Sequence, residues 1–512
     1  MNIVLLSVFD GIDNIGVRKV GAYLRRLTPN VDIYFLVPGN FRGLLSTLLM
    51  IGESDMEDSE INEAVDSLVH ADIIGFSSMS GYAHIVKKII DAIKKKHSKR
   101  PYLIWGGIHP IVNPEDAILS VDAICTGEGE FAFEMFFSKY TSGQDFFDTP
   151  SFWFNTPQGV QKNNNLPLMT SQIMSELPLM IYQDREKIYK KGKGFVELIE
   201  KDFVAHNSVA YHTIFTIGCP LKCNFCSNSA FIKYDLNYRK IRHPSVSYIV
   251  KEIKTAINKH PFISVIVFND DGFMALKADT LREFSLLYKK EIGIPFVVAG
   301  VIPTYVREEK MKILVDAGMK RVRMGIQSGS ERILNFYRRS TPIRSIRSAA
   351  QILNQFKDKM VPPAFDLILD NPVEKLEDTL ATLDLIYELP RPFTLNFFSL
   401  RILPNTQLSK DVETAGVDIE QLKSGNYRKT LPTLGNCLLY LLVVYKPSNR
   451  IYTFFRGRVK PSHENQPIYP VSMIFLRLLY LAKRAFYHLR HLEFSNLPGF
   501  VAYYWWRLRN LF

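Results

Sequence analysis

The residues best suited to carry chemistry are three closely spaced cysteines, Cys219, Cys223 and Cys226. Their spacing is C-x3-C-x2-C, and the run contains no fourth cysteine and no histidine. Three thiolates can bind three irons of a cubane [4Fe-4S] cluster, which leaves the fourth iron open. An open metal position is typical of a catalytic site rather than of a structural one. The motif therefore predicts an iron–sulfur centre with a free coordination position.

A zinc knuckle is the alternative metal site for these thiols. Structural zinc takes four protein ligands, usually as two spaced pairs. The two remaining cysteines, Cys125 and Cys437, lie far away in the sequence, so zinc is disfavoured. The sequence does not indicate a role for either of them. Because most of the cysteines belong to one metal motif, a disulfide framework is also disfavoured and a reducing, cytoplasmic location is expected.

The elements that must position this motif begin with an alternation of strands and helices over residues 1–140. A continuous apolar run at residues 2–8 indicates a strand that is buried on both faces. Further strands are expected at 31–37, 71–77, 101–105 and 122–126, with helices at 17–27 and 83–97. This order predicts an α/β fold with a doubly wound, Rossmann-like parallel sheet, which binds ligands at the carboxyl ends of its strands.

A connector is expected over residues 141–205, with a hairpin that turns at Pro157-Gln158-Gly159. Alternation resumes over 206–410, where strands are expected at 212–217, 265–269, 296–299, 321–326, 364–370 and 394–403. Six βα units predict a (β/α)6 partial TIM barrel, although the pattern alone also fits a second doubly wound sheet. Barrel chemistry lies where the strands end, and the cysteine run follows the first of them.

Residues 411–512 are expected to form a helical, basic and aromatic region. The chain carries a net charge of +12, and residues 440–512 hold 11 Lys/Arg and 2 Glu, so 11 − 2 = +9 lies in this last part. Residues 471–492 show an apolar stripe at helical spacing, with most of their basic residues off the stripe, and residues 503–509 are aromatic and basic. Such a segment suits the anionic inner face of a membrane. A helical cap on the barrel mouth and an RNA-binding surface are the alternatives.

The sequence gives no sign of a signal peptide at its start. It also contains no run of about 20 uncharged apolar residues, the length that a membrane-spanning helix requires. A cytoplasmic protein, peripheral at most on the inner face of the membrane, is the resulting expectation.

The cysteine run, with Thr216, Gly218 and Pro220 around it, resembles the signature of the radical S-adenosylmethionine (SAM) superfamily. One departure is Ile217, where many relatives carry a more polar residue. The resemblance implies a [4Fe-4S] cluster whose open iron is chelated by SAM. It also implies reductive cleavage of SAM to a 5′-deoxyadenosyl radical, with an electron donor such as flavodoxin or ferredoxin.

Matching strand ends hold the residues that the resemblance assigns to SAM or substrate, namely Asp270, Asp271, Gln327, Ser328, Glu331 and Asp370. The alternatives are a helix-capping role for the Asp pair and a first-turn helix charge for Glu331. Residues 370–374 depart from the family's Gly-x-Pro-Gly-Glu, because Asp370 and Val373 replace the glycines. Pro404-Asn405-Thr406 likewise lacks the glycine of the family's Pro-Gly-Thr.

The first 140 residues resemble the cobalamin-binding domain that is fused to one large radical SAM class. Three segments carry this resemblance: 77–80, 105–110 and 126–130. The implied cobalamin contacts are Asp10, Ser77, Ser78, Gly106, Gly107, His109 and Glu128. The usual Asp-x-His-x-x-Gly motif has Ile12 in place of its histidine, so cobalamin bound without a histidine ligand is expected. The alternative is a retained fold that binds no cobalamin.

Together these resemblances predict a cobalamin-dependent radical SAM enzyme that methylates an unactivated carbon of a lipid, isoprenoid or tetrapyrrole-like substrate. A radical SAM cyclase or oxidoreductase, with cobalamin absent or not a methyl donor, is one alternative. A nucleic-acid-modifying or RNA-binding protein is another. It is disfavoured because such relatives carry extra N-terminal cysteines and a C-terminal β-barrel, whereas this tail has a helical pattern.

Overall fold

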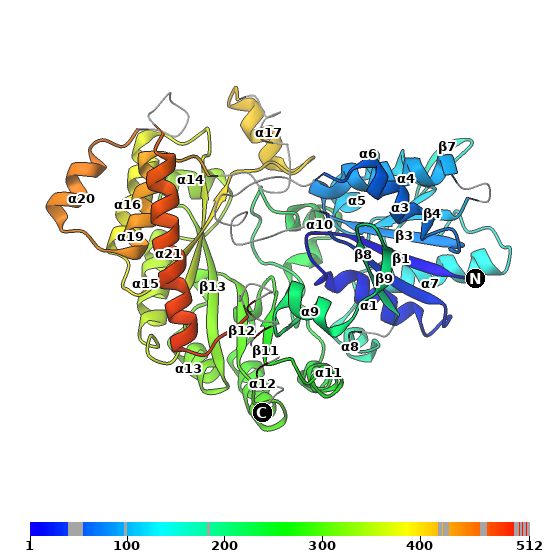
Figure 1. The fold of residues 1–512 in the computed structure, drawn as a ribbon, viewed down its shortest axis with the longest axis horizontal. Coiled ribbons are helices and arrows are strands. Elements are labelled where there is room, and N and C mark those ends of the chain that lie inside the picture. Colours follow the sequence, from blue (N-terminus) through cyan, green and yellow to red (C-terminus); the bar gives the residue numbers. More distant parts are fainter. Residues whose placement is uncertain are drawn as a thin grey trace.

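The computed structural model describes residues 1–38, 55–96, 100–180, 182, 185–417, 422, 430–460 and 468–495, with positions 501, 504 and 508. It has three parts in a row: a first sheet with its helices, a second sheet with its helices, and a helical layer on the outer side of the second sheet (Figure 1). The predicted fold class is confirmed by this arrangement.

The first sheet has nine strands in the order β7-β6-β5-β4-β3-β1-β2-β8-β9. Their bounds are β1 Ile3–Val8, β2 Val31–Leu36, β3 Ile73–Ser78, β4 Tyr102–Gly106, β5 Ala123–Cys125, β6 Phe152–Thr156, β7 Gly159–Lys162, β8 Glu186–Lys190 and β9 Gly194–Glu197. The strands from β5 to β8 in this order run parallel, and β6, β7 and β9 pair antiparallel at the edges. The expected connector thus adds strands to both edges of the first sheet.

Strand β1 is buried along its whole length because helices cover both faces of the sheet. Its residues alternate between two cores, with Ile3 and Leu5 in one and Val4, Leu6 and Val8 in the other. The first core contains residues of α1 (Ile15–Leu24) and α7 (Gly129–Thr141), and the second those of α3 (Asp58–Asp66) and α4 (Ala83–Lys96). The continuous apolar run is therefore explained by burial on both sides. Short helices α5 (Ile108–Val112), α6 (Pro114–Ile118), α8 (Ser171–Glu176) and α9 (Glu200–Asn207) fill the connections.

The second sheet has six parallel strands in sequence order, β10 to β15, and its two edge strands are β10 and β15. The strand bounds are β10 Ala210–Thr213, β11 Val265–Phe268, β12 Phe296–Val301, β13 Met319–Gln327, β14 Ala364–Leu369 and β15 Thr394–Ser399. The helices between them are α10 Asn228–Tyr234, α11 Val246–Lys259, α12 Ala278–Glu291, α13 Glu308–Asp316, α14 Glu331–Phe336, α15 Ile343–Asn354, α16 Leu376–Glu388 and, after β15, α17 Gln407–Thr414. This is the open βα barrel that the pattern predicts.

The first barrel strand ends earlier than expected. It spans Ala210–Thr213, whereas the apolar pattern suggested 212–217. The reason is that Ile217 leaves the parallel sheet and forms an antiparallel bridge with Arg242. The backbone that precedes the cysteines is therefore turned out of the barrel wall before the motif begins.

The C-terminal part contains α19 (Leu434–Val444), α20 (Asn449–Arg456) and α21 (Pro470–Arg490), and α19 packs between α16 and α21. Helix α20 is held to α16 through Asp384, which accepts hydrogen bonds from Tyr452 at 2.7 Å and from Arg456 at 2.6 and 2.7 Å. None of the described helices combines the length and the apolar character that crossing a bilayer requires. Most of the aromatic end at 503–509 lies outside the described residues.

Candidate active site

The loop between β10 and α10 carries the cysteines and is held against residues 238–242. Ile217 and Arg242 exchange two backbone hydrogen bonds of 2.9 Å, and the Cys219 N–H donates to the Tyr238 carbonyl at 3.0 Å. Gly218 lies between these contacts with φ +108°, where a Cβ would stand 2.4 Å from the Lys240 carbonyl oxygen. Only glycine combines this backbone conformation with so close an approach. This turn therefore explains why a glycine precedes the first cysteine of the motif.

The opposite side of the loop is held by the end of α14 and by α17. The Asn224 N–H donates to the Tyr337 carbonyl at 3.1 Å, and its side-chain amide donates to the Phe336 carbonyl at 2.8 Å and to Asp411 at 2.7 Å. The Phe225 ring meets the Tyr337 ring edge to face, with centroids 5.3 Å apart. The three cysteines thus lie on a loop that is anchored on both sides.

The three thiols lie in a poorly solvated environment. Burial is the main cause that raises the pKa of Cys219 to about 11 and that of Cys226 to about 12, and the nearby Asp271 carboxylate and neighbouring cysteines add to it. Metal binding would be needed to hold these sulfurs as thiolates at neutral pH. Among the described residues, no three His, Cys, Asp or Glu side chains converge as ligands of a single metal ion. A cubane cluster requires another arrangement, because each thiolate binds a different iron. The three soft sulfur donors on one braced loop fit that group.

Arg339 is a site residue that sequence reasoning missed. It is buried beside the loop, and its guanidinium donates to the Cys223 sulfur at 3.6 Å and to the Gly325 carbonyl. A buried guanidinium keeps its charge, so it supplies a positive charge to an anionic centre. No spacing rule identifies an arginine that follows a short helix, and the only sequence signal is its position soon after the segment 324–331.

Asp270 and Asp271 follow β11, and they have different surroundings. The buried Asp270 carboxylate accepts the backbone N–H groups of Phe215 and Thr216, and burial is the main cause that raises its pKa to about 7. Asp271 accepts a hydrogen bond from the Tyr238 hydroxyl at 3.3 Å, and burial raises its pKa as well. Asp270 therefore joins the ends of β10 and β11, while Asp271 lies beside the cysteine loop. Their assignment to SAM stays a prediction.

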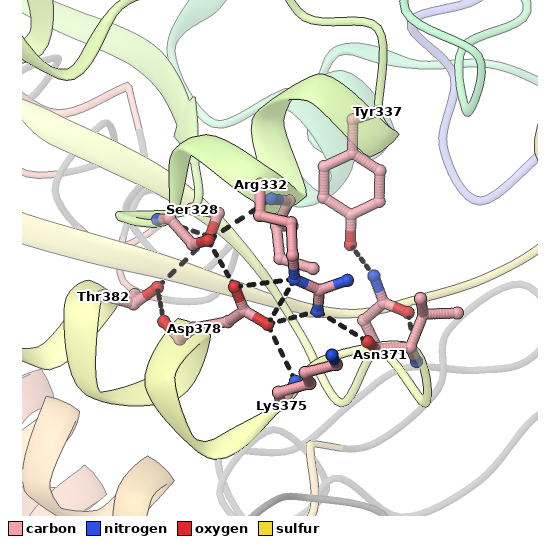
Figure 2. Close-up of polar contacts among 10 residues, drawn as sticks. Ser328, Arg332, Tyr337, Asn371, Lys375, Asp378 and Thr382 are labelled. Carbon is pink, nitrogen blue, oxygen red and sulfur yellow. Dashed lines mark hydrogen bonds and ion pairs between the residues drawn. The ribbon is translucent and has the colours of Figure 1, made fainter.

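Gln327, Ser328 and Glu331 end β13 and begin α14. Gln327 has φ +64°, and its amide lies close to Gly325, as does the guanidinium of Arg339. Ser328 is buried and turned to α16, with its hydroxyl 3.2 Å from that of Thr382 (Figure 2). Glu331 is exposed in the first turn of α14. Of these three predicted SAM contacts, Gln327 is the one that shares the surroundings of Gly325 with Arg339, which contacts Cys223.

Asp378 in α16 is the centre of a polar cluster beside that segment. Its carboxylate accepts hydrogen bonds from Ser330, from the Arg332 guanidinium and from the Lys375 N–H, as Figure 2 shows for the labelled partners. Burial opposes ionisation of Asp378, but the hydrogen bonds from Arg332 and Ser330 outweigh it and lower the pKa. These contacts fix the start of α14, which follows the Gln327 turn.

The two barrel loops that lack the family's glycines keep a left-handed backbone. Asp370 has φ +57° and Asn405 has φ +55°. Asp and Asn are the residues that best tolerate this region in place of glycine. The Asp370 carboxylate accepts hydrogen bonds from the Asn436 side chain at 2.9 Å and from the Leu431 N–H at 3.0 Å. Asp370 thus links the end of β14 to the segment leading into α19, and its role toward SAM stays a prediction.

The predicted cobalamin contacts lie at the carboxyl ends of β1, β3, β4 and β5. Asp10 follows β1 and is partly exposed. The Ser77 hydroxyl accepts from Asn14 at 3.1 Å, and the Ser78 hydroxyl accepts from the Trp105 indole N–H at 3.0 Å. These hydroxyls therefore also tie neighbouring strand ends together.

Gly106 and Gly107 form an open strand end. Gly107 has φ +84° and is exposed, and a Cβ on it would lie 3.0 Å from the Ser77 hydroxyl and 3.1 Å from the Ser78 nitrogen. His109 is buried, with one ring nitrogen 3.2 Å from the Ser80 hydroxyl and the other 3.0 Å from Asp116. Burial is the main cause that lowers the His109 pKa, against the effect of Asp116. The glycine edge fits a bulky ligand, and both His109 nitrogens already have partners.

Contacts between the first sheet and the cysteine loop bring the two candidate sites together. Glu128 accepts the Met169 N–H at 2.7 Å and lies 2.9 Å from the Arg242 guanidinium, whose backbone pairs with Ile217. Helix α5, which follows Gly107, contacts α10, which follows the cysteines (Figure 1). Asp13, in the loop after β1, lies 3.7 Å from His212 in β10. The Glu128–Arg242 and Asp13–His212 pairs join residues far apart in sequence, so only the fold reveals them.

Comparison with known proteins agrees with this architecture. The family model described as "B12 binding domain" matches residues 1–137, and the model "Radical SAM superfamily" matches residues 213–386. A search of curated proteins returned no match.

Solved structures share the whole fold. The radical SAM methyltransferase TsrM from Kitasatospora setae, with cobalamin and a [4Fe-4S] cluster bound, has a TM-score of 0.63 at 14% identity, covering 95% of this chain and 100% of that one. The cobalamin-dependent radical enzyme OxsB, with aqua-cobalamin and SAM bound, has a TM-score of 0.60 at 17% identity, covering 95% of this chain and 72% of that one. At these identities the likeness shows the fold.

The two family matches cover the two sheets of the structure. A cobalamin-binding sheet therefore contacts an open radical SAM barrel that carries a loop with three cysteines. The chain belongs to the radical SAM superfamily, in the class with an N-terminal cobalamin-binding domain. Its cofactors are accordingly a [4Fe-4S] cluster, SAM and cobalamin.

Proposed function

We propose that this radical SAM enzyme methylates an unactivated carbon atom of a lipid, isoprenoid or tetrapyrrole-like substrate in the cytoplasm. The observation that carries the proposal is a direct connection between the two candidate sites. The predicted cobalamin contact Glu128 pairs with Arg242, whose backbone bridges Ile217 just before the cysteines. Methylation by two cofactors requires that both act on one substrate, which proximity of their sites allows. A lipid or isoprenoid substrate would reside in a membrane, and the exposed apolar side chains of α20 and α21 suit contact with one.

The chain's own residues have distinct parts in this proposal. Cys219, Cys223 and Cys226 hold the cluster, and Arg339 places a positive charge at the Cys223 sulfur. Asp271 and Gln327 are the best placed of the predicted SAM contacts. When bound, the cluster supplies the electron for SAM cleavage and cobalamin serves as the methyl carrier. A small electron-transfer protein such as flavodoxin or ferredoxin supplies that electron in the cell.

The predicted cobalamin contacts remain those at the strand ends of the first sheet. Ile12 is fully buried in the core, and both His109 nitrogens face Ser80 and Asp116. This arrangement supports cobalamin binding without an imidazole from these two positions.

The nucleic-acid alternative has no support from the C-terminal region. The elements in its described stretches 430–460 and 468–495 are helices, whereas that class of relatives ends in a β-barrel. The mass of the product distinguishes the proposed methylation from the cyclase or oxidoreductase alternative, because methylation adds one CH2 and cyclisation removes hydrogen.

The test uses full-length protein, purified and reconstituted without oxygen, with SAM, dithionite and hydroxocobalamin. 5′-Deoxyadenosine is assayed by mass spectrometry and bound corrinoid by its absorption spectrum. We expect both, and loss of deoxyadenosine in Cys226→Ala but not in Cys437→Ala, which removes a cysteine remote from the loop. Deoxyadenosine without bound corrinoid would favour the cyclase or oxidoreductase alternative. Absence of deoxyadenosine from iron-replete protein would contradict the radical mechanism.

A further inference from the structure

The outer helical layer presents an apolar surface where a soluble helix would normally be polar. Helix α21 turns Met473, Tyr480 and His488 inward, and the Tyr480 hydroxyl donates to the Leu395 carbonyl of β15 at 2.6 Å. The side of α21 that faces away from β15 is therefore the one that meets solvent.

That outer side of α21 carries large exposed apolar residues, and α20 exposes two phenylalanines of its own. Val471, Phe475, Phe486 and Leu489 repeat at helical spacing, and Phe454 and Phe455 are exposed on α20. The exposed fractions of these six side chains range from 37% to 79%. We call this set the outer apolar face. A surface helix ordinarily places polar residues there, so a stripe of large apolar residues indicates a binding surface.

The charge of the same layer is almost wholly positive. The described stretches 430–460 and 468–495 contain nine Lys/Arg and one acidic residue, Glu493. Glu493 is buried, and its carboxylate lies 2.8 Å from the His488 ring. Exposed cations flank the apolar residues of α20, among them Arg450 and Arg458, and the Arg458 guanidinium lies 3.5 Å from the Phe454 ring centroid. The layer therefore offers apolar side chains and positive charge but no exposed carboxylate within these stretches.

We propose that the outer apolar face of α20 and α21 binds an anionic lipid bilayer, with its phenylalanines entering the interface and its cations meeting lipid headgroups. Such a combination of aromatic and basic residues on helices that do not span is characteristic of interfacial binding. A second copy of the chain is a poorer occupant, because two equally basic faces repel each other.

The position of the face is compatible with catalysis. Helices α20 and α21 lie on the side of the barrel away from the first sheet (Figure 1). Binding there leaves the contacts between Glu128 and Arg242, and between α5 and α10, untouched. The proposal does not depend on the cofactors, so it can fail or hold separately from the proposed methylation.

The test is vesicle co-sedimentation of the full chain without added SAM or cobalamin. We expect binding to vesicles of phosphatidylcholine mixed with phosphatidylglycerol, and much weaker binding to phosphatidylcholine alone. Phe475→Ser with Phe486→Ser should lower the affinity by roughly tenfold or more, because two large apolar side chains are lost from the bilayer. Arg450→Glu with Arg458→Glu should also lower it by at least roughly tenfold.

Leu286→Ser is the matched control, since Leu286 is an exposed apolar residue of α12 in the barrel. It should leave vesicle binding unchanged, and circular dichroism should show all variants folded. Equal binding by the wild type and the Phe475/Phe486 double variant would overturn the proposal, as would no binding to anionic vesicles. A wild-type dimer that the same double variant dissociates, without any vesicle binding, would assign the face to a second copy instead.

Discussion

The Arg339 guanidinium donates a hydrogen bond to the sulfur of Cys223 across 3.6 Å, and the two residues are 116 positions apart. Arg339 also donates to the Gly325 carbonyl, while its Nε has no hydrogen-bond partner among the described residues. A fixed positive charge and an N–H donor at a cluster sulfur favour the reduced, more negative cluster. Arg339 is therefore placed to set how easily the cluster accepts its electron.

We expect Arg339→Gln to lower the midpoint potential of the reconstituted cluster. The physical reason is that reduction adds negative charge beside a position that has lost its cation. A shift on the order of 59 mV would correspond to a tenfold change in the one-electron equilibrium. The measurement is a redox titration followed by electron paramagnetic resonance, on samples matched in iron content.

Arg339→Lys retains the charge and serves as the matched variant, with a smaller expected shift. An unchanged potential in iron-replete Arg339→Gln would show that the contact with Cys223 has no electrostatic effect on the cluster.

The contact between Asp370 and Asn436 predicts that Asp370 acts mainly as a link between β14 and α19. Asp370→Asn should lower the free energy of unfolding by about 1–3 kcal/mol, because a buried hydrogen bond to a charged group is weakened. Asn436→Ala should have a similar effect, and SAM affinity should stay within about threefold of wild type in both. Denaturant unfolding and calorimetric SAM titration are the measurements. Loss of SAM affinity in Asp370→Asn alone, at unchanged stability, would instead support a direct contact.

The parallel strands and the cluster cysteines could be predicted because their signals are local. The apolar run at β1 reports burial on both faces, and the Gly218-Cys219 pair reports a tight turn. The strands β8 and β9 could not be placed, because short, half-exposed strands carry no pattern that tells which sheet they join.

The residues around the site were harder to predict because their partners lie far away in the sequence. Arg339 and Cys223 meet only after the barrel brings β10 and β13 to one end. The missing glycines were a misleading signal, since Asp370 and Asn405 adopt the left-handed backbone that glycine favours. Local chemistry thus identifies the ligands, while long-range packing selects their neighbours.

Glu374 predicts a pH dependence of stability. Its side chain is buried, and desolvation together with the nearby Asp378 and Asp370 raises the pKa from 4.5 to about 8. The folded state therefore holds a proton that the unfolded state releases above pH 4.5, so stability falls as the pH rises from 4.5 toward 8. Glu374→Gln should remove the part of this decline that Glu374 causes, so that the variant exceeds the wild type by a few kcal/mol near pH 8, on the order of 1.4 kcal/mol per pKa unit.

Chemical denaturation of cluster-free protein at a series of pH values measures this effect. Glu377→Gln is the control, because Glu377 is a nearby but exposed carboxyl. This variant should keep the wild-type dependence of stability on pH. Parallel profiles for wild type and Glu374→Gln would contradict the raised pKa.

The pair formed by Glu128 and Arg242 predicts that the cobalamin domain and the cysteine loop are energetically coupled. The Arg242 guanidinium lies 2.9 Å from Glu128 and donates to the Met169 carbonyl at 2.7 Å, while its backbone holds Ile217. If Glu128 braces the loop, Glu128→Gln and Arg242→Gln should lower both iron content and corrinoid retention, and the double variant should be little worse than either. A coupling energy of about 0.5–3 kcal/mol is expected from the unfolding cycle. Lys240 is an exposed neighbour of Arg242, so Lys240→Gln should change neither the iron content nor the corrinoid retention. If Glu128 contacts cobalamin directly instead, Glu128→Gln should lose corrinoid at full iron content while Arg242→Gln retains it. The effects of the two substitutions on the free energy of unfolding should then be additive.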